Sequence, residues 1–238
     1  MESVKRAIIM AAGMGKRMMP LTVDTPKPLI KVHGTPMIET IIIGLRQNNI
    51  AEIYIVAGYL HDKFEYLVMK YPGVVIIKNP YYEVSNNISS LYVARDYLEN
   101  AMILDGDQII NNLEVLKADF EKSGYNCVWT EFETKEWLLT VVDDHVVQCR
   151  REGGRRGWQL YSISRWTAED GRKLKRHLEI EFDERKNRQI YWDDIALFCY
   201  PEEYDLGIMP MGAEDVIEID NLKELAEVDH LYENYAGE

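Results

Sequence analysis

The sequence predicts an α/β fold of the Rossmann type, with a doubly wound, mostly parallel mixed sheet and a smaller C-terminal subdomain. Up to Asp107, short apolar runs alternate repeatedly with segments of helical periodicity. Those runs are continuously apolar, as in parallel strands that helices cover on both faces. Beyond Asp107 the runs become partly alternating and are joined by short polar links, which predicts a more antiparallel second half.

The N-terminal half begins with a strand from Val4 to Met10 that ends in a turn. Thr35 and Pro36 are typical of an N-cap and a first helical position, so a helix is expected to follow. Its apolar face is formed by Met37, Ile38, Ile41, Ile42 and Leu45. The next predicted elements are a strand at 53–56, a helix at 61–70, a strand at 74–77, a helix at 89–98 and a strand at 101–104.

The second half is expected to hold four strands, a helix, and a final strand and helix. The strands are predicted at 125–132, 137–142, 146–150 and 158–164, with a turn at 152–157. An amphipathic helix is predicted at 168–178, a mobile charged loop at 179–189, a strand at 216–219 and a helix at 222–232. We expect a single domain over residues 1–238, with a core at 1–124 and a second part at 125–238.

Composition places the chain among folded globular proteins. Its 238 residues are 47% hydrophobic and 28% charged, which excludes intrinsic disorder. The 27 Lys and Arg against 40 Asp and Glu give a formal net charge of −13. Because this charge repels a polyphosphate backbone, nucleic acid is not expected as a partner.

The sequence disfavours a membrane span, a disulfide framework and a metal site built on cysteine or histidine. No apolar run approaches the roughly 18 residues that span a bilayer, so we predict a cytoplasmic protein without a membrane segment. The 3 cysteines lack CxxC spacing and predict neither a disulfide framework nor a zinc site. The 5 histidines show no metal-ligand spacing either.

A glycine-containing loop follows the first predicted strand. Its residues are Ala11, Ala12, Gly13, Met14, Gly15, Lys16 and Arg17. The two glycines allow a ligand to approach backbone N–H groups closely, and the two basic side chains add charge, which favours an anion such as a triphosphate. The loop is neither a Walker loop nor the dinucleotide-binding fingerprint, so taken alone it is equally compatible with a structural turn.

The continuation of this loop carries a resemblance. Residues 7–31 read AIIMAAGMGKRMMPLTVDTPKPLIK and closely resemble the signature of the nucleotidyltransferases that make NDP-sugars and CDP-alcohols. The segments VAGY at 56–59 and LDGD at 104–107 are similar to two further motifs of that family. The resemblance implies that Gly13, Gly15 and Arg17 wrap a triphosphate and that Lys27 reaches the reacting phosphates. It further implies base contacts near Gly58 and Tyr59.

Within this superfamily the chain most resembles the bacterial CTP:phosphocholine cytidylyltransferases. The features are YEVSNNISSL at 82–91, Glu136-Trp137, the segment 191–193 and IEID at 217–220. The resemblance implies nucleotide contacts at Asn87 and Ser90. The segments 138–142, 153–157 and 161–165 depart from the pattern and flank the expected acceptor pocket.

Nucleotidyl transfer also predicts a metal site. Charge develops on the reacting phosphorus and on departing pyrophosphate, so Mg²⁺ on one or two carboxylates is expected. Asp107 and Asp220 each follow an apolar strand and suit this role. We interpret Asp105 as a turn carboxylate or a support for the ligands. Glu218 is compatible with either a rim contact or an acceptor contact.

The resulting hypothesis is transfer of CMP from CTP to phosphocholine, with Lys27, Arg17 and Lys16 as the catalytic cations. The acceptor oxygen attacks the α-phosphorus, so no protein nucleophile is needed. The acceptor's cationic head is expected near the side chains Trp137, Tyr191, Trp192, Asp193 and Glu218, although Trp192 is equally compatible with the core. The alternatives are 2-aminoethylphosphonate or phosphoethanolamine as acceptor, or a nucleotide-binding regulatory module without turnover.

Overall fold

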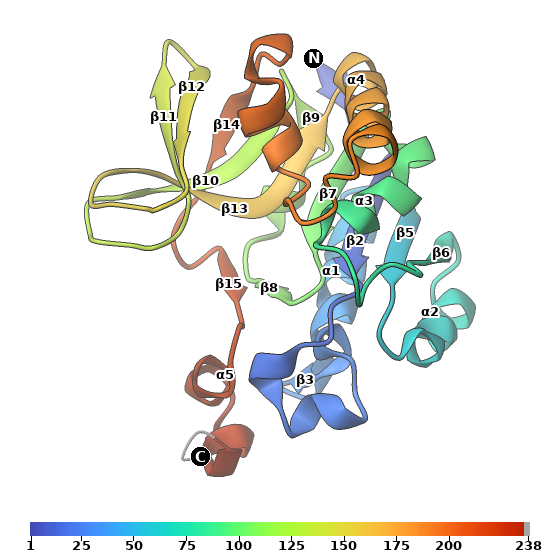
Figure 1. Ribbon diagram of the computed structural model, residues 1–238. Helices are drawn as coiled ribbons and strands as arrows, with labels where there is room; N and C mark the ends of the chain where they lie inside the picture. The colour runs from blue at the N-terminus through green and yellow to red at the C-terminus, as the bar shows by residue number, and fades with distance from the viewer. Residues whose placement is uncertain (236–238) are drawn as a thin grey trace.

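The computed structural model describes residues 1–235, and its centre is a nine-stranded mixed sheet (Figure 1). Along the main path the strand order is β12-β11-β13-β7-β2-β5-β6, with β10 pairing both β13 and β14. Strands β7, β2, β5 and β6 run parallel to one another. Strand β13 pairs antiparallel with β7, so a single sheet continues from the first half of the chain into the second.

The strands of this sheet are β2 (Arg6–Ala11), β5 (Glu52–Ala57), β6 (Val74–Lys78), β7 (Ala101–Asp105), β10 (Gly124–Thr130), β11 (Leu138–Val142), β12 (His145–Arg150), β13 (Gly157–Trp166) and β14 (Gly207–Pro210). Three small sheets pair β1 (Glu2–Ser3) with β9 (Asp119–Phe120), β3 (Lys31–Val32) with β4 (Thr35–Pro36), and β8 (Gln108–Ile110) with β15 (Val216–Glu218). The α-helices are α1 (Met37–Gln47), α2 (Glu65–Lys70), α3 (Ile88–Val93), α4 (Ala168–Glu179) and α5 (Leu222–Val228).

Helices cover both faces of the parallel strands, which confirms the doubly wound α/β prediction. Successive residues of a strand point to opposite faces, and β2 follows this rule. Ile9 belongs to a core cluster with residues of α1 and α2, whereas Ile8 belongs to a second cluster with residues of α3 and α4. Because both faces of β2 are buried beyond Arg6, its sequence is continuously apolar from Ala7 to Ala11.

A third, smaller core cluster joins the two ends of the chain. It contains Met18 and Val32 from the N-terminal loops, Met37 of α1, and Leu225 of α5. In Figure 1, α5 lies beside β3, at the end of the molecule opposite the β11–β12 hairpin. The Tyr232 hydroxyl donates to the Lys31 carbonyl at 2.7 Å. The C-terminal segment is thereby held against the loops that follow β2.

The structure corrects several predicted element boundaries. Helix α1 begins at Met37 with Pro36 as its N-cap, and Thr35 belongs to β4. The predicted helices at 61–70, 89–98 and 222–232 are each divided into an α-helix and a 3₁₀ segment. Strands β1, β3, β4, β8, β9 and β14 were not predicted.

The predicted mobile loop at 179–189 is wrong for its first half, where a π-helical turn, Ile180–Glu184, continues α4. One of its acids is buried, because Glu181 accepts hydrogen bonds from Arg185, Asn187 and Tyr200. Within the described residues, no helix has the length and apolar character needed to cross a membrane.

Candidate active site

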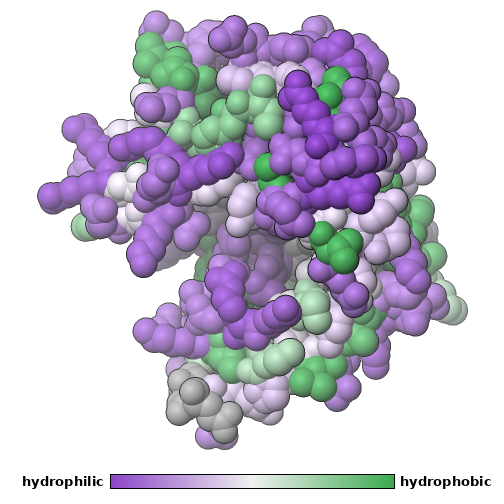
Figure 2. Space-filling model, in the orientation of Figure 1, coloured by the Kyte–Doolittle hydropathy of each residue, from purple (hydrophilic) through white to green (hydrophobic). Residues whose placement is uncertain are grey.

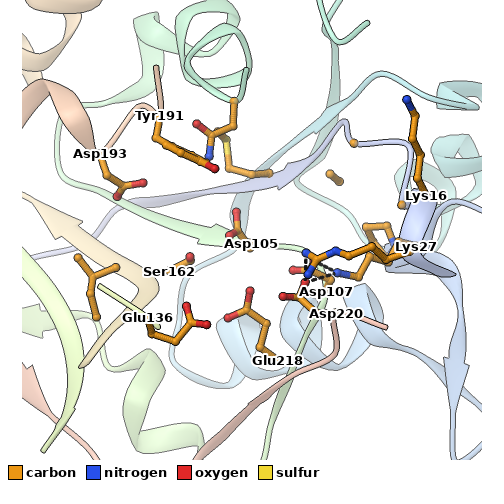
Figure 3. Close-up of a pocket in the computed structure, with 18 of the residues that line it drawn as sticks. Lys16, Lys27, Asp105, Asp107, Glu136, Ser162, Tyr191, Asp193, Glu218 and Asp220 are labelled. Atoms are coloured by element: carbon orange, nitrogen blue, oxygen red, sulfur yellow. Dashed lines mark hydrogen bonds and ion pairs between the residues drawn. The ribbon is translucent and has the colours of Figure 1, made fainter. Parts of the chain in front are cut away.

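A pocket of about 540 Å³ lies beyond the carboxyl ends of β2 and β7, where an open α/β sheet places its ligands. Figure 2 shows it as a hollow on the face of the molecule, and Figure 3 shows its side chains. The lining residues are Met10, Ala11, Gly13, Gly15, Lys16, Arg17, Lys27, Pro28, Asn87, Asp105, Asp107, Glu136, Trp137, Leu160, Ser162, Tyr191, Asp193, Glu218 and Asp220.

The loop after β2 needs glycine at one position for two reasons. Gly15 has a φ of 61°, a left-handed conformation that favours glycine. A Cβ atom at this position would also lie 3.0 Å from both the Lys27 Cβ and the Thr22 Cγ2. The Thr22 hydroxyl donates to the Gly15 carbonyl at 2.9 Å and fixes the turn. Gly15 therefore allows Lys27 to pass directly behind the loop.

Lys27 connects the two predicted metal ligands. Its Nζ lies 2.5 Å from Asp107 Oδ2 and 2.9 Å from Asp220 Oδ1, and Arg17 Nη2 also lies 2.9 Å from Asp220 Oδ1. Burial lowers the pKa of Lys27, but the two carboxylates outweigh it and hold the pKa above its ordinary value. The same contacts hold the pKa of Asp220 below its usual range, although burial opposes them.

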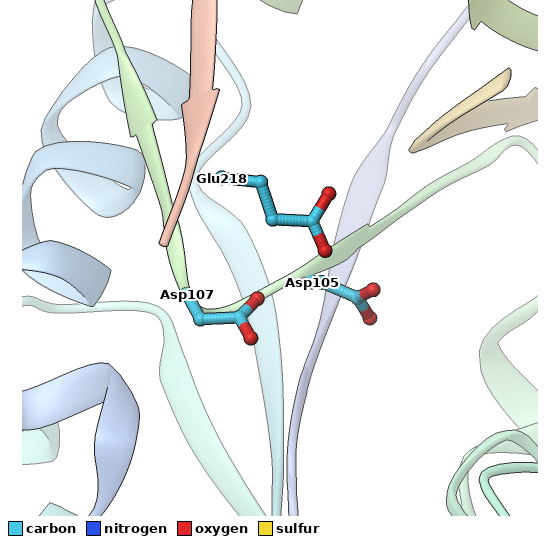
Figure 4. Close-up of side chains that lie close together, drawn as sticks. All are labelled: Asp105, Asp107 and Glu218. Atoms are coloured by element: carbon cyan, nitrogen blue, oxygen red, sulfur yellow. The ribbon is translucent and has the colours of Figure 1, made fainter. Parts of the chain in front are cut away.

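Three carboxylates converge beside this ion pair. Asp105 ends β7, Asp107 precedes β8, and Glu218 ends β15, which pairs with β8 through Gln108. One oxygen from each carboxylate lies within 4.8 Å of the other two (Figure 4). Burial, reinforced by the Asp107 charge, raises the pKa of Asp105 to about 7 and that of Glu218 to about 9.

The carboxylate cluster has the donor atoms that a hard divalent cation requires. Asp107 Oδ1 is buried and has no hydrogen-bond partner among residues 1–235. Mg²⁺ binds through carboxylate oxygens, water and substrate phosphates, so the residues present fit this ion. Asp107 belongs to two candidate ligand sets, the predicted pair with Asp220 and the trio with Asp105 and Glu218.

The opposite end of the pocket is acidic and aromatic. Trp137 and Tyr191 meet edge to face, with ring centroids 5.6 Å apart and planes at 85°. Asp193 points into the pocket beside them (Figure 3). Its Oδ1 is buried without a hydrogen-bond partner in the described part of the chain. Burial, together with the Asp105 charge, raises the pKa of Asp193 well above its ordinary value.

The remaining predicted site residues do not line the pocket. They are Ala12, Met14, Gly58, Tyr59, Ser90 and Trp192. The Tyr59 hydroxyl donates to the Thr22 and Val23 carbonyls at 2.9 and 3.0 Å, so it supports the glycine loop from outside. Ser90 accepts a hydrogen bond from Asn79.

Trp192 is not brought to the acceptor end. Its side chain is only 2% exposed and packs against Tyr125 and Trp166, with centroids 6.2 and 6.0 Å away. Tyr191 and Trp192 lie in a turn, where adjacent side chains diverge. The backbone N–H of Trp192 instead donates to Asn87 Oδ1 at 2.9 Å, which helps to hold that pocket residue.

Six pocket residues were not among the predicted site residues: Met10, Pro28, Asp105, Glu136, Leu160 and Ser162. Glu136 adjoins Trp137, so its position in the resembling segment could have indicated it. Leu160 and Ser162 lie on β13, and the register that pairs Ile163 with Leu104 brings them beside Asp105. No local pattern encodes this register, because it depends on pairing between strands far apart in the sequence.

Comparison with known proteins identifies the family. Residues 7–175 match the MobA-like NTP transferase domain. The chain belongs to this family. A 2-aminoethylphosphonate cytidylyltransferase of Lancefieldella rimae is 38% identical over 95% of this chain and 92% of its own length. A choline-phosphate cytidylyltransferase of Haemophilus influenzae is 35% identical over 91% and 92%.

A solved structure supports the same assignment. The CTP:phosphocholine cytidylyltransferase of Streptococcus pneumoniae superposes with a TM-score of 0.89 and 31% identity, covering 96% of this chain and 99% of the other. The chain is thus a nucleotidyltransferase of the cytidylyltransferase group. The glycine loop, Lys27, Asp105 and Asp107 lie within residues 7–175, which match the family model. Glu218 follows that segment in the chain.

Proposed function

We propose that this protein transfers the cytidylyl group of CTP to an oxygen of a small phosphonate or phosphate that carries a cationic amine head. The observation that carries the proposal is the polarity of the pocket. Lys16, Arg17 and Lys27 line one end and suit a triphosphate, whereas the other end presents carboxylates and aromatic rings. A molecule with an anionic group and a cationic group is complementary to this arrangement when its anion faces the nucleotide.

In the proposed reaction the acceptor oxygen attacks the α-phosphorus of CTP in line. A bond forms between that oxygen and the phosphorus, and the bond to the β-phosphate bridging oxygen breaks, so pyrophosphate leaves with the electron pair. The acceptor oxygen is already ionised, so no protein nucleophile or base is required. Lys27 and Arg17 position the phosphates and stabilise their negative charge.

The carboxylates of the pocket are proposed to hold Mg²⁺. When bound, Mg²⁺ would act as a Lewis acid on the reacting phosphates. Asp107 would hold it with Asp220, or with Asp105 and Glu218. Asp220 also orients Arg17 and Lys27 through its ion pairs.

For the acceptor we favour 2-aminoethylphosphonate, whereas the sequence alone favours phosphocholine. A primary ammonium donates N–H bonds and needs oxygen acceptors in direct contact. The buried oxygen of Asp193 supports such a contact. The relative from Lancefieldella rimae, a 2-aminoethylphosphonate enzyme, supports it as well. Phosphocholine stays the second candidate because the Trp137–Tyr191 pair could receive a quaternary ammonium.

A pyrophosphate-release screen of four nucleotides against 2-aminoethylphosphonate, phosphoethanolamine, phosphocholine and glucose 1-phosphate tests the proposal. We expect CTP to be preferred and 2-aminoethylphosphonate to exceed phosphocholine in kcat/KM by at least about tenfold, or roughly 1.4 kcal/mol. The reverse preference would establish phosphocholine. Absence of turnover with every pair would favour a nucleotide-binding module.

Asp193→Asn tests the contact that underlies this preference. The substitution removes the charge that would face the ammonium, so kcat/KM for 2-aminoethylphosphonate should fall by about 1.5–3 kcal/mol, the worth of a hydrogen bond to a charged group. Phosphocholine serves as the matched control, because its head donates no such bond. An equal loss for both acceptors would contradict a direct contact.

A further inference from the structure

Arg151 lies just outside the pocket. It contacts Trp137, which lines the pocket, and Asp194, which holds the backbone of Tyr191. It follows β12, and its side chain is half exposed. Arg151 Nη2 lies 2.5 Å from Asp194 Oδ1, on a carboxylate that is itself only 2% exposed. Its Cζ lies 3.9 Å from the ring centroid of Phe198 and 5.4 Å from that of Trp137.

These contacts reach Tyr191 and Trp137 by two routes. Asp194 Oδ2 accepts a hydrogen bond from the Tyr191 backbone N–H at 3.0 Å. Phe198 meets Trp137 edge to face at 5.6 Å, and Trp137 meets Tyr191 at the same separation. A planar guanidinium can form an ion pair and cover aromatic rings at the same time, which an ammonium does less well.

The ion pair between Arg151 and Asp194 also gives the adjacent residues Asp193 and Asp194 different surroundings. Asp194 turns away from the pocket to Arg151, whereas Asp193 lines the pocket. Without Arg151, the charge of Asp194 would be buried beside Asp193 with its main counter-charge gone. The turn at 191–194 would then lose the contact that fixes its orientation.

We infer that Arg151 is a positioning residue for the acceptor, since it holds Trp137 and the 191–194 turn in the geometry that receives the cationic head. This inference rests on the proposed function, because it takes the acidic and aromatic end as the acceptor end. Arg151 contacts neither the glycine loop nor Lys27. Its loss should therefore affect acceptor binding and leave CTP binding unchanged.

The test compares Arg151→Met with Arg156→Met. Arg156 belongs to the turn between β12 and β13 and covers Trp129 at 5.6 Å, but Trp129 lies away from the pocket. We expect Arg151→Met to raise the KM for the preferred acceptor by about tenfold or more, with the KM for CTP changed by less than about twofold. Arg156→Met should change neither constant, and Arg151→Lys should recover part of the loss.

An unchanged acceptor KM in folded Arg151→Met would overturn the inference, as would equal increases in both KM values. If Arg151→Met does not fold, Arg151→Met combined with Asp194→Asn removes the buried charge as well and is measured in its place. Wild-type protein that turns over no acceptor would instead overturn the proposed function.

Discussion

At the scale of single residues, cationic side chains form ion pairs with the carboxylates of the site. Lys27 Nζ lies between Asp107 and Asp220, which are the predicted metal ligands. Lys27 occupies Asp107 Oδ2 and Asp220 Oδ1, so it competes with a divalent cation that is held by this pair. CTP would draw Lys27 and Arg17 toward its phosphates and so release the carboxylates. We therefore expect the metal to bind weakly before the nucleotide and tightly with it.

Lys27→Met tests this competition without any turnover. The neutral side chain frees Asp107 Oδ2 and leaves only Arg17 on Asp220, so the variant should bind Mn²⁺ at least about tenfold more tightly than wild type when no nucleotide is present. Electron paramagnetic resonance of free Mn²⁺ measures the affinity.

Two further variants complete this experiment. Lys16→Met removes an exposed lysine of the same loop and should leave the affinity unchanged. Lys27→Met combined with Asp107→Asn should lose the gain. Equal Mn²⁺ affinity in wild type and Lys27→Met would contradict the competition.

Much of the site was predictable because its residues sit in short contiguous motifs. Gly13, Gly15, Arg17 and Lys27 lie in one segment and line the pocket. The location of Trp192 in the core was not predictable, because a turn decides which of two adjacent aromatic residues points inward.

At the scale of elements, a buried carboxylate joins the first two helices. Glu39 of α1 is only 4% exposed. It accepts hydrogen bonds from Tyr66 and Lys70 of α2, and from Tyr71 just beyond that helix. Burial raises the pKa of Glu39, but these hydrogen bonds outweigh it and hold the pKa below its ordinary value. The contact aligns α2 with α1 beneath the same face of the sheet.

Glu39→Gln should lower the free energy of unfolding at pH 7 by about 1–3 kcal/mol, because donors that faced a carboxylate lose part of their partner. A carboxyl with a depressed folded pKa stabilises the fold above its unfolded pKa, and this stabilisation is lost as pH falls through the folded pKa. The difference between wild type and Glu39→Gln should therefore shrink below about pH 4.5.

Urea unfolding at several pH values checks this prediction. Glu65→Gln is the matched control, because Glu65 is an exposed residue of α2. A Glu39→Gln effect that does not depend on pH, or one equal to that of Glu65→Gln, would contradict the assigned role.

The elements that were predicted correctly carry their signal in their own residues. Strand β2 is apolar from Ala7 to Ala11 because both its faces are buried there. Strand β14 escaped prediction because its four residues, Gly207–Pro210, owe their extended form to pairing with β10. The turn at 180–184 escaped because the charge of Glu181 is buried and paired within the protein.

At the scale of the whole molecule, both halves of the chain contribute to one pocket. The loop after β2 supplies Lys16 and Arg17 at its cationic end, and the segment before β11 and the 191–194 turn supply its acidic and aromatic end. The antiparallel pairing of β15 with β8 returns the C-terminal segment to the site and brings Glu218 and Asp220 with it. Because the net charge is −13, the basic loop must offset a field that repels CTP.

The central claim is that the acceptor oxygen attacks the α-phosphorus of CTP. The most direct test is the reaction of CTP with 2-aminoethylphosphonate labelled with ¹⁸O in its phosphonate group, followed by mass spectrometry of the products. We predict a CMP adduct that keeps every ¹⁸O atom of the acceptor, together with unlabelled pyrophosphate. Release of free CMP without an adduct, or ¹⁸O in the pyrophosphate, would contradict the account.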